Sequence, residues 1–215
     1  MFLLLASRHA LGDDDSLFAW GANATHLPPL DSAWRLLAST FLHAGPGHLF
    51  FNATTLIIFG PAVERVFTRW GFWIVYAAGG AVASSASLLW RDAHGSAASF
   101  SVGASGAIFA LGGALMVGAF RLRHRLAVGR ARSLAAAVLY LAGTGFAEGF
   151  THNGTDNIAH AGGLVSGALI AMTLGVNPRL GGRGAGWLTR GLAALAVLAL
   201  AWSLACGIRS GFAGR

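Results

Sequence analysis

Residues 101–120, SVGASGAIFALGGALMVGAF, form a stretch without a single charged side chain. An α-helix rises about 1.5 Å per residue, so a stretch of about 20 residues crosses the roughly 30 Å of hydrocarbon in a bilayer. Stretches of similar character cover residues 41–63, 70–90, 133–150, 157–176 and 187–208. The pattern predicts an all-α fold, a polytopic bundle of transmembrane helices.

The composition of the whole chain agrees with burial in lipid. Of the 215 residues, 55% are hydrophobic and only 11% are charged, and the mean hydropathy is +0.61. Soluble domains carry about 25% charged residues, so the usual polar surface is missing here. The single cysteine, Cys206, excludes an internal disulfide and a cysteine-rich metal site.

The net charge of +7 comes from arginines, since the chain has no lysine. A basic chain suggests nucleic acid as a partner, but these arginines cluster in the short connections after the first, third and fifth predicted spans. That distribution is typical of the cytoplasmic side of a membrane protein. We therefore expect the lipid bilayer as the partner and no nucleic acid.

Few strongly polar side chains fall inside the predicted spans, and four of them lie at similar depth near the outer ends. They are His48, Asn52, Ser105 and His160. Polar groups at membrane depth are costly and mark functional sites. His48 and Asn52 are four residues apart and therefore share one helical face.

Small residues surround the serine and the second histidine. Ser105 lies between Gly103 and Gly106, while Gly163 and Gly167 follow His160 at spacings of three and seven. Glycine faces allow two helices to approach closely. We therefore expect the hydroxyl of Ser105 and the imidazole of His160 to lie within hydrogen-bond reach.

A serine beside a histidine is the nucleophile and base pair of acyl transfer. We expect Ser105 to attack, His160 to act as general base and acid, and the oxyanion to be bound by Asn52, His48 and the backbone N–H of Ser105. The only nearby carboxylate, Asp156, precedes the predicted span, so a dyad is expected.

Four motifs in order resemble the rhomboid family of intramembrane serine proteases. They are Trp34-Arg35, His48-x-x-x-Asn52, Gly103-x-Ser105-Gly106 and Ala159-His160-x-x-Gly163-x-x-x-Gly167. The resemblance implies a helical core with a water-filled cavity that opens outward, and hydrolysis of transmembrane protein substrates near the outer leaflet. It also implies that Phe109 packs against the histidine, that Trp34 and Arg35 lie in an outer loop, and that no metal or organic cofactor takes part.

The resemblance also divides the chain. Residues 1–29 are expected to be the remnant of a first helix and part of the outer loop. The segment before Gly12 is too short to span a bilayer, so we favour a true start of the protein further upstream. Residues 30–178 match the protease core, and residues 179–215 a cytoplasmic linker and an extra C-terminal transmembrane helix. A multi-pass protein of a bacterial inner membrane is expected.

Two other classes of function stay open at this point. A small transporter or channel would use His48 and His160 as a proton path. Such a protein is expected to contain internal repeats, and the sequence shows none. A catalytically inactive, rhomboid-like membrane chaperone would lack the serine or the histidine. The sequence predicts neither the physiological substrate nor the oligomeric state.

Overall fold

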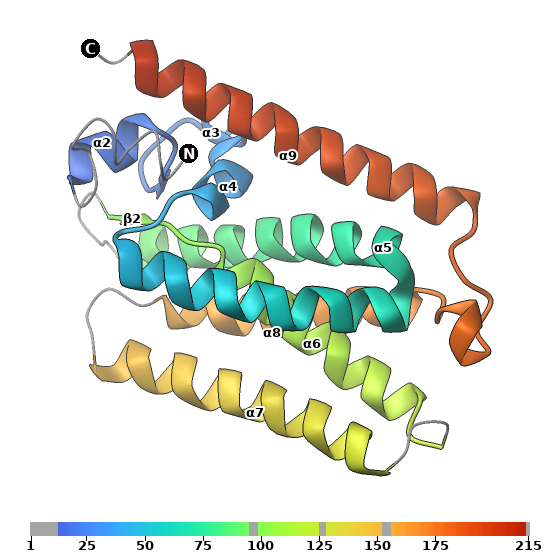
Figure 1. Cartoon of the computed structure of the whole chain (residues 1–215). Coiled ribbons are helices and arrows are strands. Elements are labelled where there is room, and N and C mark those ends of the chain that lie inside the picture. The colour runs from blue at the N-terminus through green and yellow to red at the C-terminus, as the bar shows by residue number, and fades with distance from the viewer. Residues whose placement is uncertain (1–12, 95–98, 125–127, 152–155, 214–215) are drawn as a thin grey trace.

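The structure, a computed structural model, describes residues 13–94, 99–124, 128–151 and 156–213. Long helices dominate this part of the chain and run side by side (Figure 1). They are α5 (Pro46–Ala93), α6 (Ser105–Arg121), α7 (Val128–Thr151), α8 (Asn157–Thr173) and α9 (Trp187–Ala213). The predicted all-α membrane bundle is confirmed.

Short elements make a layer at one end of the bundle. Residues 13–45, called the outer loop below, hold α2 (Asp14–Ala19), β1 (Asn23–Ala24), α3 (Pro29–Ser32), α4 (Arg35–Ala38) and η1 (Ser39–Phe41). Strand β1 pairs antiparallel with β2 (Phe100–Ser101), which lies just before α6. The outer loop is therefore hydrogen-bonded to the segment that enters α6. A further short helix, η2 (Pro178–Leu180), connects α8 with α9.

Helix α5 consists of two arms that correspond to two predicted spans, residues 41–63 and 70–90. The break between them is at Thr68, which has φ 69° and ψ 166°. Few non-glycine residues adopt such a backbone conformation, because the Cβ atom clashes with the chain. The N–H of Asn177 donates to the Val66 carbonyl at 2.8 Å, so the segment after α8 supports this turn.

Two helices begin later than predicted, and the local sequence explains both differences. The first arm of α5 begins at Pro46 instead of residue 41, because proline is preorganised for the first position of a helix. Helix α6 begins at Ser105 instead of residue 101, because Gly103 has φ +123° and Phe100–Ser101 is in β2. Ser105 thus lies at the very start of its helix.

The outer surface of the bundle is apolar. By length and composition, α5 and α9 suffice to cross a membrane, while Ser105–Arg121, Ala135–Ala147 and Asn157–Thr173 are shorter apolar helices. Large apolar side chains are exposed on α5 and α9, among them Ile57 (73%) and Leu195 (62%). Water does not cover such surfaces favourably, whereas lipid does.

Helices α6 and α8 approach one another through glycines. A Cβ atom on Gly163 would overlap the Gly106 carbonyl oxygen, and one on Gly167 would overlap the Ala110 carbonyl oxygen. A Cβ on Gly113 of α6 would likewise overlap the backbone of Leu164. The two backbones are therefore in direct contact, as glycine faces in membrane helices allow.

Helix α9 packs on the bundle and the outer loop with one narrow face. Its buried residues are Ala193, Leu200, Ser203, Gly207 and Gly211, which repeat at helical spacing. Gly211 lies directly under the ring of Trp20, which is 1% exposed. The C-terminal end of α9 thereby covers the buried part of the outer loop.

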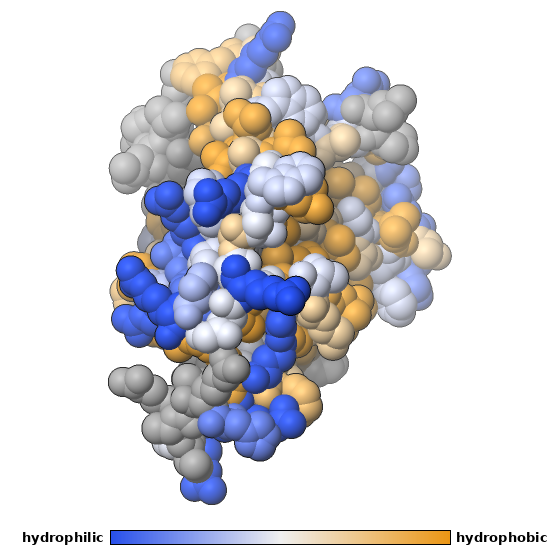
Figure 2. Space-filling view, turned by 90° about the vertical axis from the view of Figure 1, so that its right-hand side faces the viewer, coloured by the Kyte–Doolittle hydropathy of each residue, from blue (hydrophilic) through white to orange (hydrophobic). Residues whose placement is uncertain are grey.

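The two ends of the bundle differ in charge. The turn within α5, the last turn of α6, the first turn of α7 and the connection from α8 to α9 lie at the end opposite the outer loop (Figure 1). These connections carry most of the arginines, among them Arg65, Arg121 and Arg183. Figure 2 views this end, where hydrophilic residues gather among apolar ones. The expected remnant of a first helix falls largely in residues 1–12, outside the described residues.

The contact between α6 and α8 leads to a stability prediction. Gly167→Ala should destabilise the protein by about 1–3 kcal/mol, because the added methyl group displaces the α6 backbone. Gly191→Ala is the matched control, since a Cβ on Gly191 in α9 meets nothing within 4 Å and alanine favours the helix. Thermal unfolding in detergent measures both variants. Equal melting temperatures for the two would contradict the packing that we describe.

Candidate active site

Ser105 is positioned by the backbone that precedes it. It is the first residue of α6, so its N–H has no partner four residues earlier within the helix. The N–H of Gly103 donates to the Ser39 carbonyl at 3.0 Å, which fixes the turn before the serine to the outer loop. The first N–H groups of a helix favour negative charge nearby.

His160 lies one turn into α8 and faces Ser105. Its Nε2 atom is 3.0 Å from the Ser105 Oγ atom, a hydrogen-bond distance between residues 55 positions apart. His160 is 3% exposed, and Ser105 is half-buried. The structure therefore brings together the two side chains that the sequence singles out.

The hydroxyl of Ser105 contrasts with other helical hydroxyls of the chain. Ser85 and Thr55 donate to carbonyls four residues earlier in their own helix, each at 2.8 Å. Such bonds within a helix are the usual role of membrane serines and threonines. The hydrogen bond that the structure shows for the Ser105 side chain is the one to His160.

Aromatic rings hold the imidazole in place. The Phe109 ring stacks on the His160 ring at a centroid distance of 4.1 Å and an interplanar angle of 5°. The contact that the resemblance implies for Phe109 is therefore present. The same imidazole contacts the ring of Phe146 of α7 edge-on, with a centroid distance of 6.1 Å. The sequence analysis did not single out Phe146. Gly145 leaves room for this arrangement, because a Cβ there would lie 2.6 Å from Phe109 Cζ.

His48 and Asn52 lie beside the turn that precedes Ser105. A Cβ atom on Gly103 would lie 2.7 Å from the His48 ring and 3.7 Å from Asn52 Nδ2. Asn52 is 7% exposed, and its Nδ2 atom has no hydrogen-bond partner among the described residues. A buried amide without a partner is uncommon in proteins, so this N–H group is available to a bound oxygen atom.

One further histidine belongs to this cluster. His43 is 5% exposed, and its ring contacts the His48 ring with a centroid distance of 5.1 Å and an interplanar angle of 71°. From the sequence, His43 was expected to lie at the membrane interface, one turn outside His48, with no role in the site. The structure buries it in the outer loop, where it supports one side of the His48 ring.

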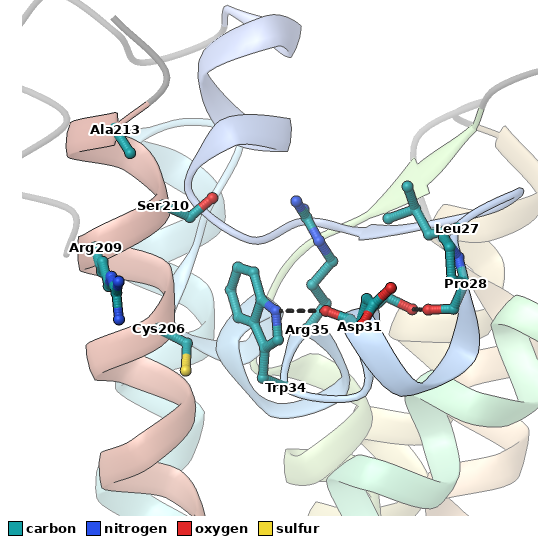
Figure 3. Close-up of a pocket in the computed structure, with 10 residues that line it drawn as sticks. Leu27, Pro28, Asp31, Trp34, Arg35, Cys206, Arg209, Ser210 and Ala213 are labelled. Carbon is teal, nitrogen blue, oxygen red and sulfur yellow. Dashed lines mark hydrogen bonds between the residues drawn. The ribbon is translucent and has the colours of Figure 1, made fainter.

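Trp34 and Arg35 hold the outer loop together instead of contacting Ser105. Arg35 is buried, and its NH1 atom donates to the carbonyls of Phe18 (2.6 Å) and Ala22 (3.1 Å). The indole N–H of Trp34 donates to the Asp31 carbonyl at 3.0 Å (Figure 3). Both residues line a cavity of about 400 Å³ between the outer loop and α9, which does not include Ser105 or His160.

Among the residues that the structure describes, no group of three His, Cys, Asp or Glu side chains is arranged to hold a metal ion. His160 is hydrogen-bonded to Ser105, and His48 and Asn52 lie beside Gly103, two residues before it. Their arrangement suits proton transfer and the binding of an oxyanion.

Comparison with known proteins identifies the family. The rhomboid domain matches residues 30–177. The rhomboid protease GluP of Bacillus subtilis is 36% identical over 201 residues, which cover 94% of this chain and 37% of GluP. RHOMBOID-like protein 4 of Arabidopsis thaliana is 32% identical over 154 residues, 70% of this chain and 36% of that protein.

The rhomboid protease AarA of Providencia stuartii is 26% identical over 175 residues, 74% of this chain and 62% of AarA. The chain spans well under half the length of the first two of these relatives. The matched region contains α4 to α8 and, with them, every residue of the cluster around Ser105. The chain belongs to the rhomboid family of integral membrane proteins.

Proposed function

We propose that this chain is an intramembrane serine endopeptidase that hydrolyses peptide bonds of transmembrane proteins through a dyad of Ser105 and His160. The observation that carries the proposal is the 3.0 Å distance between Ser105 Oγ and His160 Nε2. Relatives named as proteases support it. Residues 30–178 would form the protease core.

The reaction begins with proton transfer to His160. As the Ser105 oxygen attacks the carbonyl carbon of the substrate, its proton passes to His160 Nε2. The tetrahedral intermediate then collapses, the C–N bond breaks, and His160 returns the proton to the leaving amine. A water molecule, deprotonated by the same imidazole, then attacks the acyl carbon. The ester bond to Ser105 breaks, and His160 returns the proton to the Ser105 oxygen.

The negative oxygen of the intermediate requires hydrogen-bond donors. The amide of Asn52 has a buried N–H group without a partner among the described residues, and the His48 ring lies beside Gly103. The N–H of Ser105 starts α6 and completes the set. Donors fixed in place before the reaction stabilise developing charge most effectively.

A dyad fits the surroundings of His160 better than a triad does. Among the described residues, no carboxylate is hydrogen-bonded to the Nδ1 atom of His160, which lies beside the backbone of Gly145. Asp156 instead caps α8, because its carboxylate accepts the N–H of Ala159 at 2.9 Å. The aromatic rings of Phe109 and Phe146 orient the imidazole in place of a carboxylate.

The arginine-rich end of the bundle supports an orientation. Positive residues favour the cytoplasmic side of a membrane, and the outer loop lies at the opposite end of the bundle (Figure 1). The turn before Ser105 is bonded to this loop at Ser39, so Ser105 would lie toward the outer leaflet. Residues 179–215 would then hold a cytoplasmic linker and a helix that returns to the outer side. A bacterial inner membrane is the proposed location, and GluP is a bacterial relative.

The nucleophile is tested with a serine-directed fluorophosphonate probe on the detergent-solubilised protein. We expect the probe to label the wild type, because His160 activates the hydroxyl, and to leave Ser105→Ala and His160→Ala unlabelled. Ser85→Ala is the matched control and should label like the wild type, since that hydroxyl bonds within its own helix. Absence of labelling in the folded wild type would reject the protease in favour of an inactive chaperone or a transporter.

The oxyanion site is tested with Asn52→Ala. Loss of one oxyanion donor lowers kcat by about 10²-fold to 10³-fold, and we expect this loss with a nearly unchanged KM, because the amide serves the intermediate. Cleavage of a fluorogenic transmembrane substrate in detergent measures both constants. A wild-type kcat in a folded Asn52→Ala variant would show that Asn52 is not an oxyanion donor.

A further inference from the structure

Arg91 lies in the last turn of α5, at the end of the bundle where arginines are few. The charge distribution that explains the arginines at the other end gives no reason for it. Arg91 is half-buried, so holding its guanidinium there has a desolvation cost unless the group is well bonded. Its contacts therefore need an explanation of their own.

The guanidinium bonds a residue of its own helix and two other segments. Its Nε atom donates to the Ser87 hydroxyl at 3.1 Å, NH1 donates to the Ser99 carbonyl at 2.8 Å, and NH2 donates to the Asn23 carbonyl at 3.0 Å. Ser99 directly precedes β2, and Asn23 lies in β1 opposite Ser101. Arg91 thus fixes the strand pair from which the chain runs, within four residues, into Ser105.

The same group is connected with His160 through Ser87. The Ser87 side chain is 1% exposed and donates its hydroxyl to the Asp156 carboxylate. Asp156 caps α8 through the N–H of Ala159, and its carbonyl accepts the N–H of His160 at 3.1 Å. The first turn of α8, which carries the imidazole, is therefore bonded to α5 through Ser87.

We propose that Arg91, acting through Ser87 and Asp156, is a positioning residue that sets the distance between Ser105 and His160. The guanidinium of Arg91 is planar and has several donors in fixed directions. It bonds the segment that leads to Ser105 and, through the Ser87 hydroxyl, the Asp156 cap of α8. This inference rests on the proposed function. Misplacing catalytic groups by about 1 Å costs about 10²-fold in rate.

Arg91→Lys tests the role with the positive charge retained. A lysine ammonium is a point charge and does not reproduce the fork of a guanidinium, so it does not satisfy Ser87, Ser99 and Asn23 together. We expect kcat to fall about 10-fold to 100-fold, with KM within about twofold because Arg91 is not placed at the substrate. Arg209→Lys, on α9 at the same end of the bundle, is the control and should keep the wild-type kcat.

Active-site titration separates positioning from a purely structural role. The fluorophosphonate probe counts competent sites, and kcat is expressed per labelled site. Positioning predicts a wild-type number of sites, each slower, whereas a structural role predicts fewer sites, each with the wild-type rate. Unchanged kcat per site in Arg91→Lys would overturn the inference, while an unlabelled wild type would instead overturn the proposed function.

A second variant tests the connection to Asp156. Asp156→Asn keeps a good helix cap but replaces one acceptor oxygen of the carboxylate by an amide nitrogen, which disturbs the bond from Ser87. If the two residues act through one network, the losses in kcat of Arg91→Lys and Asp156→Asn should be less than multiplicative in the double variant. Fully multiplicative losses would show that the two residues act independently and would contradict the proposed connection.

Discussion

The direct contact between the backbones of α6 and α8 is the constraint on which the rest of the structure depends. Gly163 and Gly167 lie against the carbonyls of Gly106 and Ala110, where no side chain fits. Helices in lipid associate through close packing and polar contacts, and this contact holds the two helices together at backbone distance. It also places the first turns of both helices side by side, and those turns carry Ser105 and His160.

The features that follow from composition and local spacing were predictable from the sequence. The apolar stretches predicted the long helices, and the glycines around Ser105 and after His160 predicted that the two helices meet. The predicted starts of α5 and α6 were a few residues too early. Single residues, Pro46 and Gly103, determine where these helices begin. The fold of the outer loop was not predicted, since its short elements depend on contacts with β2 and α9.

The residues that the sequence analysis missed share a physical reason. His43 lies in the loop before α5, and Phe146 and Arg91 reach the site or its supports from segments distant in the chain, so no spacing within one helix predicts their contacts. Arg35 was placed in the outer loop by the resemblance, but its contacts with the Phe18 and Trp34 rings depend on how that loop closes. The sequence did contain one indication for Arg91. It lies at the end of the bundle where arginines are few, so specific hydrogen-bond partners are expected for it.

Close packing alone leaves the geometry of the pair incomplete. Glycine contacts fix how near α6 and α8 lie, but a smooth glycine face opposes rotation and sliding of one helix along the other only weakly. Stacking of Phe109 on the imidazole restricts rotation, because the two rings stay nearly parallel only in one orientation. Sliding is restricted where polar bonds tie the first turn of α8 to α5, at Asp156 and Ser87. Distance, rotation and axial position are therefore held by three different kinds of contact, and a hydrogen bond of 3.0 Å between Ser105 and His160 requires all of them.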